Sequence, residues 1–224
     1  SKYGGNQDNQ SEANFKGVLE EYDRQMGRLL DGLKELGIAA NTLVLFTGDN
    51  GPLPSYDNRR TGGLRGSKLS LYEGGIREPL LVWWPGRAPA GLVDQRTVFT
   101  AVDLLPSLCR IASAPVPGAV AARLDGQDLS AAFTGHPVRN RKPIFWEYGR
   151  NATSFAYPKA PRDRSPNVAM REDNWKLLIN ADGSGAELYN LAADPKEGKN
   201  LAEIKRNLTK RLSRQAMNWR KSLP

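Results

Sequence analysis

The stretch LVLFTGDNGP, residues 43–52, joins a strand-like run to an abrupt polar ending. Its first half is almost wholly apolar, as expected for a strand that is covered on both faces of a sheet. Asp49 and Asn50 follow directly, with a glycine on either side of the pair. Because ligands of open α/β sheets bind beyond the carboxyl ends of the strands, these two side chains stand where a binding site is expected. The stretch therefore predicts a buried strand at residues 42–47 whose end carries candidate binding residues.

The Asp49-Asn50 pair has two interpretations at this level. Its side chains offer hard oxygen donors, which suit Ca²⁺ or Mg²⁺, and the flanking glycines allow a close backbone approach. Calcium takes roughly 6–8 oxygen ligands, however, and these two residues alone cannot supply them. Asp-Asn-Gly is also a good turn sequence by itself. Residue type leaves both a metal site and a plain turn open.

Helices and a second strand are predicted around this stretch. Residues 12–36 carry apolar side chains at helical spacing, and Gly37 is a plausible stop for that helix. A second buried strand is predicted at residues 79–84, and a helix with Pro106 in its first turn at residues 101–114. A parallel sheet needs more strands than these, so the order of elements reads like the second half of a larger α/β domain.

The character of the chain changes near residue 115, after which short strands replace helices. Turn sequences between the last three strands favour antiparallel pairing. We therefore predict a fold of the α/β class in two parts. Residues 1–138 form the C-terminal part of a mixed, mostly parallel sheet flanked by helices. Residues 139–224 form a small α+β subdomain with a roughly four-stranded antiparallel sheet and a terminal helix. The predicted strands are residues 143–148, 167–171, 175–180 and 187–191, and the helix runs from Ala202 to about Ser222.

Composition narrows the function classes only a little. The 224 residues are 39% hydrophobic and 25% charged, as in an ordinary soluble domain. The longest apolar run, residues 80–84, is far too short to span a bilayer, and residues 1–13 contain no signal-peptide core. The net charge of +8 favours anionic partners without choosing among nucleic acid, sulfated sugar and phosphate.

The loop at residues 48–68 is long, polar and rich in glycine and proline, which in a compact domain indicates function or disorder. Lys68 ends it, after Gly62-Gly63-Leu64-Arg65-Gly66-Ser67, where a lysine is either an anion clamp beside backbone N–H groups or an ordinary surface residue. The loop arginines either bind sulfate or phosphate through two hydrogen bonds each or remain solvated. These arginines are Arg59, Arg60 and Arg65.

The remaining reactive residue types are sparse. Cys109, the only cysteine, lies in an apolar helical stretch and is predicted to be a small core residue. His136 lies in a polar loop, and a single histidine excludes a site built from several histidines. The basic terminal helix is predicted to present a solvated face rather than bind a polyanion. Asn151 and Asn207 begin Asn-x-Thr patterns, which match glycosylation acceptors but recur by chance.

Several segments taken together resemble the C-terminal half of a type I sulfatase of the arylsulfatase kind, within the alkaline-phosphatase-like superfamily. Their order and spacing match that family across most of the chain. The segments are YDRQMGRLLDGLKELGIAANTLVLFTGDNGP, GGLRGSKLSLYEGGIREPLLVWWPG, TAVDLLPSLCRIA, MREDNWKLLI and ELYNLAADPKEGKNLAE.

The resemblance implies roles for four residues. Asp49 and Asn50 match the family's second pair of calcium ligands. Lys68 matches the lysine that contacts the sulfate group of the substrate. Glu73, in Tyr-Glu-Gly-Gly, matches a recurrent position that we take as structural. With these roles, the Asp49-Asn50 pair is better interpreted as calcium ligands than as a plain turn.

The departures from the family are equally informative. The family's nucleophile is a formylglycine made from cysteine in a Cys-x-Pro-x-Arg motif of the N-terminal half, and no such motif occurs here; the context of Cys109 does not fit it. The aspartate pair that completes the calcium site, and an arginine, a second lysine and two histidines around the sulfate, are also missing. We therefore expect the chain to be a C-terminal fragment that is inactive alone and binds calcium weakly at most.

The expected function of the intact enzyme is calcium-dependent hydrolysis of sulfate esters. Calcium would polarise the sulfate, hydrated formylglycine would attack sulfur, and Lys68 would neutralise developing negative charge. The expected partner is a sulfate ester, with sulfated sugars as candidates, and not nucleic acid. Half a sheet would expose an apolar edge, so self-association is also expected. The family resemblance suggests a periplasmic, secreted or lysosomal location, which the sequence itself does not assign.

Two other functions stay open. One is a non-catalytic anion-binding module that keeps the Lys68 loop and the basic surface. The other is a phosphatase or phosphonate hydrolase on the same fold. The residues upstream of Ser1 would decide between the enzyme classes, because formylglycine chemistry requires the Cys-x-Pro-x-Arg motif.

Overall fold

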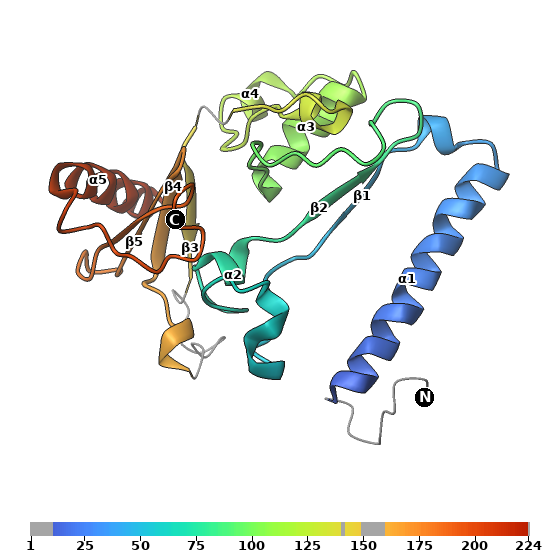
Figure 1. The fold of residues 1–224 in the computed structure, drawn as a ribbon. Coiled ribbons are helices and arrows are strands. Elements are labelled where there is room, and N and C mark those ends of the chain that lie inside the picture. The colour runs from blue at the N-terminus through green and yellow to red at the C-terminus, as the bar shows by residue number, and fades with distance from the viewer. Residues whose placement is uncertain (1–10, 140–141, 149–159, 224) are drawn as a thin grey trace. The chain divides into compact units, whose positions relative to one another are not determined.

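The computed structural model describes residues 11–139, 142–148 and 160–223 (Figure 1). Contacts within the chain define two compact units, each assembled from separate stretches of sequence. The first unit comprises Ser1–Phe46, Leu80–Asp94 and Ala131–His136, and the second comprises Thr47–Pro79, Gln95–Ser130 and Pro137–Pro224. The predicted boundary between residues 138 and 139 stays a prediction.

The first unit contains the long helix α1, Glu12–Glu35. Ser11 caps its start, because the Ser11 side chain accepts a hydrogen bond from the backbone N–H of Asn14 at 3.2 Å. The helix ends at Leu36, and Gly37 follows with a φ of +69°, a conformation that glycine adopts without strain. The bounds agree with the predicted helix, but α1 contains no buried residue within the described part of the chain.

Strand β1, Val44–Thr47, is hydrogen-bonded to β2, Leu80–Trp83, in a two-stranded sheet. The prediction of both strands is confirmed in position, but the prediction that they are buried is wrong. The residues of β1 are half-buried or exposed, and Leu81 of β2 is 58% exposed. The physical reason is the small number of neighbours, since two strands and one helix cannot enclose both faces of a sheet. The first unit also contains the 3₁₀ turns η1, Ala39–Asn41, and η4, whose bounds are Ser130–Thr134.

The second unit begins with short helical turns that connect longer loops. The helix predicted at residues 101–114 is a 3₁₀ turn, η3, Ala101–Asp103, followed by α3, Leu104–Ile111. Asp103 and Thr100 form a capping box at its start. Cys109 on α3 is only half-buried, so its prediction as a core residue is wrong: the buried face of this short helix is instead formed by Ser107. The other turns are η2, Tyr56–Thr61, α2, Glu73–Ile76, α4, Gly118–Ala121, and η5, Pro161–Asp163.

The predicted four-stranded antiparallel sheet is confirmed, with spatial order β3-β4-β5-β6. Met170 on β4 pairs with Leu177 on β5, and Leu177 pairs with Leu188 on β6, so one face carries a continuous apolar row. The terminal helix α5, Arg206–Ser222, packs on this face through Leu212 and Ala216, and begins four residues later than predicted (Figure 1). The strands are β3, Ile144–Glu147, β4, Val168–Glu172, β5, Trp175–Ile179, and β6, Glu187–Asn190.

The opposite face of this sheet is also covered. Leu178 of β5 and Tyr189 of β6 pack with Leu71 and Tyr72, which belong to the loop that follows the predicted anion clamp. The loop residues are nearly inaccessible, with Tyr72 only 1% exposed. The loop that follows Lys68 therefore packs against this face of the C-terminal sheet. Among the described residues no helix has the length and apolar character to cross a membrane.

Candidate functional site

The backbone after β1 is joined to the loop that contains α2. The N–H of Gly51 donates a hydrogen bond to the carbonyl of Gly75 at 2.8 Å. A Cβ added to Gly51 would lie only 2.1 Å from the carbonyl oxygen of Gly74, a distance that no side chain tolerates. The glycine that follows Asp49-Asn50 is therefore required because two backbones meet there.

The Asn50 side chain is held so that its oxygen is available. Its Nδ2 donates to the carbonyl of Gly51 at 3.0 Å, which leaves Oδ1 as an acceptor. Asp49 beside it is exposed. These two side chains provide an amide oxygen and a carboxylate at the end of β1, which is the hard-oxygen chemistry that calcium prefers.

Glu78 is a third oxygen-bearing residue at this place, and sequence reasoning missed it. A Cβ added to Gly48 would lie 2.6 Å from the Glu78 Oε2 atom, so this carboxylate lies against the backbone that leads into Asp49. Burial, together with the nearby charge of Asp49, raises the pKa of Glu78. The available signal was an acidic residue directly before Pro79 and β2, whereas binding residues of such sheets are expected after a strand.

The side chains at the end of β1 have the oxygen atoms that a hard cation binds, but there are too few of them to complete its coordination. Asp49 and Asn50 supply suitable oxygens, whereas calcium takes roughly 6–8 of them. The described residues include no cluster of three or more histidine, cysteine, aspartate or glutamate side chains able to hold a metal ion. Asp49 and Asn50 thus remain predicted ligands that need further donors.

The backbone of Lys68 is hydrogen-bonded to the same segment that contains Gly51. Its N–H donates to the carbonyl of Pro52 at 2.8 Å, one residue beyond Gly51. The residues around it are almost inaccessible, with Ser67 0% and Ser70 3% exposed. Lys68 itself is half-buried, and no hydrogen bond or ion pair joins its ammonium to another described residue. The structure therefore brings the backbones of the predicted cation-binding and anion-binding residues together and leaves the ammonium of Lys68 available.

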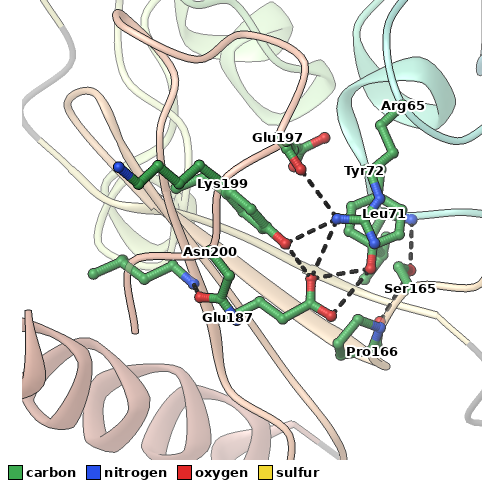
Figure 2. Close-up of polar contacts among 12 residues, drawn as sticks. Arg65, Leu71, Tyr72, Ser165, Pro166, Glu187, Glu197, Lys199 and Asn200 are labelled. Carbon is green, nitrogen blue, oxygen red and sulfur yellow. Dashed lines mark hydrogen bonds and ion pairs between the residues drawn. The ribbon is translucent and has the colours of Figure 1, made fainter. Parts of the chain in front are cut away.

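The three arginines of the loop have internal partners. Arg65 places its guanidinium 3.7 Å from the centre of the Tyr72 ring and donates from Nη1 to the Tyr189 hydroxyl at 2.8 Å. Figure 2 shows this side chain directed toward Tyr72 and Glu187 rather than outward. The prediction that Arg65 binds an anion or stays solvated is therefore wrong, because it links two parts of the fold. Arg59 donates to the carbonyl of Tyr56, and Arg60 donates to the Ser55 hydroxyl.

The other residues noted in the sequence lie elsewhere. His136 is exposed, with Nδ1 3.3 Å from the Thr134 hydroxyl, and belongs to the first unit, whereas Asp49 and Lys68 belong to the second. Asn207 is exposed near the start of α5, and Asn151 lies outside the described residues.

Comparison with known proteins identifies the family. Residues 1–114 match the family model described as sulfatase, and residues 67–222 match the model described as N-sulphoglucosamine sulphohydrolase, C-terminal. The chain belongs to the sulfatase family. The two models together cover the turn after β1, the Lys68 loop and the C-terminal sheet.

Individual sulfatases support the same assignment. Human arylsulfatase A is 32% identical over 210 residues, which are 84% of this chain and 38% of that protein. Canine N-acetylgalactosamine-6-sulfatase is 38% identical over 137 residues, which are 59% of this chain and 25% of that protein. The crystal structure of Ps i-CgsB in complex with k-i-k-neocarrahexaose has a TM-score of 0.74 at 25% identity, covering 96% of this chain and 44% of that one. The chain thus spans less than half the length of these relatives.

Proposed function

We propose that this sulfatase chain supplies one side of an active site that hydrolyses sulfate esters. The single observation that carries the proposal is the pair of backbone hydrogen bonds that joins residues 51–52 to Lys68 and Gly75 in the second unit. The N–H of Gly51 donates to Gly75 and the N–H of Lys68 donates to Pro52, at 2.8 Å each, so hydrogen bonds join the backbones that carry the hard-oxygen pair and the cationic side chain. An anionic ester that also contacts a cation needs both kinds of group side by side.

Asp49 and Asn50 would hold a calcium ion in this site. When bound, calcium would polarise the sulfate oxygens and lower the charge repulsion that opposes a nucleophile. The protein's contribution is orientation: the Asn50 amide nitrogen donates to the Gly51 carbonyl, which leaves the amide oxygen as the atom that would bind the ion. The remaining donors would come from residues other than these two.

Lys68 would bind the sulfate group or the leaving oxygen as negative charge develops. Its ammonium is unpaired among the described residues and therefore does not have to break an ion pair before it meets a substrate. The chain contains no Cys-x-Pro-x-Arg motif, so the proposed nucleophile is formylglycine outside these 224 residues. We therefore propose that the chain alone has no turnover.

Sulfated sugars are the proposed substrate class. Among the relatives, one is an N-acetylgalactosamine-6-sulfatase, and Ps i-CgsB has been solved in complex with k-i-k-neocarrahexaose. The net charge of +8 suits a polyanionic carbohydrate. Nucleic acid is not proposed as a partner, because the sulfatase relatives point to sulfate esters instead.

The test is hydrolysis by a protein that contains this chain together with a Cys-x-Pro-x-Arg segment. We expect cleavage of aryl sulfate and of sulfated monosaccharides that calcium chelation abolishes. The K68A variant should lower kcat/KM by about 100-fold, the typical effect of removing one transition-state contact. The exposed K210A variant on α5 is the matched control and should leave kcat/KM unchanged. Faster hydrolysis of aryl phosphate than of aryl sulfate would instead assign a phosphatase.

A further inference from the structure

Lys176 is the second residue of β5 and is completely buried, at 0% exposure. Its Nζ atom lies 2.8 Å from Oε1 of Glu73 and 2.9 Å from Oε1 of Glu197. Both carboxylates are buried as well, at 3% and 0% side-chain exposure. A charged group is rarely placed in a protein core without a partner, and here one ammonium serves two carboxylates from distant parts of the chain.

The Glu197 carboxylate also holds the backbone of the loop that follows Lys68. The second oxygen of Glu197, Oε2, accepts a hydrogen bond from the N–H of Glu73 at 2.7 Å. The next N–H, that of Gly74, donates to the carbonyl of Arg65 at 2.7 Å. Gly75 then accepts from Gly51, so the chain of contacts from Lys176 ends at the turn that contains Asp49 and Asn50.

A second set of contacts holds the same loop on its other side (Figure 2). Arg65 stacks on Tyr72, donates to the Tyr189 hydroxyl and donates to the carbonyl of Glu197 at 3.1 Å. The Glu187 carboxylate accepts hydrogen bonds from the hydroxyls of both Tyr72 and Tyr189. The N–H of Leu71 donates to the Ser165 hydroxyl at 2.8 Å. The loop is thus attached to the C-terminal sheet before and after Lys68.

The backbone between these attachments is strained. Leu69, the residue after Lys68, has a φ of +72°, which a residue with a Cβ rarely adopts. Such a conformation persists only where the surrounding structure enforces it, and it is frequent at functional sites. Here the surrounding structure is the set of contacts at Arg65 and at residues 71–73.

We propose that Lys176 is a positioning residue for the site: through Glu73 and Glu197 it fixes the loop that presents Lys68 and the turn that presents Asp49 and Asn50. The role of the loop in catalysis rests on the proposed function above. The attachment of the loop to β5 is independent of that function and can be tested separately.

Stability alone gives no reason for a lysine at this position. A buried ion cluster is often no more stabilising than apolar side chains of the same size, because desolvation offsets the attraction between the charges. The charges instead fix geometry, because the Lys176 ammonium must lie between the carboxylates of Glu73 and Glu197. The Glu197 carboxylate in turn accepts the hydrogen bond from the Glu73 N–H and so positions the loop backbone. The inference therefore predicts loss of loop order beyond any loss of global stability.

The first experiment uses trypsin on the 224-residue chain. Trypsin cleaves after Lys68 when the loop opens, and after Lys210 and Arg214 only when α5 opens. We expect K176M and E73Q each to accelerate cleavage after Lys68 at least tenfold relative to cleavage within α5. The control is R211Q, which breaks the ion pair between α5 and Glu172 of the same sheet and should leave the rate at Lys68 unchanged. An equal acceleration at both places, or none at Lys68, would overturn the proposal.

The second experiment uses the protein that also contains the Cys-x-Pro-x-Arg segment. If Lys176 acts through Lys68, then K176M should lower kcat/KM at least tenfold, whereas the K68A/K176M double variant should be within about twofold of K68A alone. Additive losses would mean that Lys176 does not act through Lys68. If no variant or parent hydrolyses a sulfate ester, the proposed function fails, but the trypsin result still decides whether β5 orders the loop. E73Q gives the same readouts if K176M does not fold.

Discussion

Gly51 is the residue at which two segments of the proposed site meet, and its lack of a side chain is the condition for their contact. Gly51→Ala should reduce the free energy of unfolding by about 1–3 kcal/mol, as forced insertion into a packed site usually does, because the new Cβ would meet the Gly74 carbonyl. Urea denaturation followed by tryptophan fluorescence measures this. Gly118→Ala is the control, since nothing lies within 4 Å of its added Cβ. Equal stability of the two variants would contradict the close packing.

Tyr72 and Tyr189 should give the chain an alkaline stability limit. Burial, and then the Glu187 carboxylate, raise the pKa of Tyr72 above its ordinary value. Burial, and then the hydrogen bond to Glu187, do the same for Tyr189. Because the folded state holds these protons more tightly than the unfolded state, their contribution to stability is complete below pH of about 10 and declines as pH rises further.

The measurement for these tyrosines is a titration of tyrosinate absorbance together with urea denaturation between pH 8 and 11. We expect two tyrosines to ionise only as the protein unfolds, and the free energy of unfolding to fall above pH of about 10. Y72F/Y189F is the comparison variant: it should be less stable at pH 8 but flatter with pH. Ionisation of all tyrosines in the folded state near their ordinary pKa would contradict this account.

At the scale of elements, local pattern located most strands and helices but not their burial. The predicted strands at residues 175–180 and 187–191 correspond to β5 and β6, because apolar runs bounded by turn residues are a local property. Burial of β1 was predicted wrongly because it depends on how many neighbours the strand has. Asp49, Asn50 and Lys68 were predicted from motifs and stay predicted site residues. Lys176 was not predicted, since its partners Glu73 and Glu197 lie 103 and 21 residues away along the chain.

The role of α5 as the cover of the C-terminal sheet gives a prediction at this scale. Leu212 is 0% exposed and packs with Leu177 and Leu188, so Leu212→Ala should cost about 2–5 kcal/mol of unfolding free energy. Ile204, just before α5, is 66% exposed, and Ile204→Ala should change stability by less than about 0.5 kcal/mol. Chemical denaturation of both variants measures the difference. Similar values for the two would contradict the packing of α5 on this sheet.

At the scale of the whole molecule, the two units differ in how they bury apolar surface. The second unit encloses both faces of its sheet, whereas α1 in the first unit leaves apolar side chains open to solvent. Val18 is 64% exposed, and Tyr22 and Leu29 are each 51% exposed. Residues at positions 18, 22 and 29 recur at helical spacing and form one stripe, so their exposure is a continuous apolar face rather than scattered side chains. Faces of this kind mark surfaces that bind another protein surface.

We therefore expect the 224-residue chain to self-associate through the stripe on α1. Light scattering should show a mass that rises with concentration, and Val18→Lys/Leu29→Lys should return the chain to a monomer, because two charges would be buried at the contact. The matched control is Ile204→Lys, which places the same charge on an isolated exposed apolar residue of the second unit and should leave the association unchanged. A chain that stays monomeric at all concentrations would show that the α1 stripe does not mediate association between copies. If Ile204→Lys abolishes association as fully as the α1 variant does, the contact between copies is not formed by the α1 stripe.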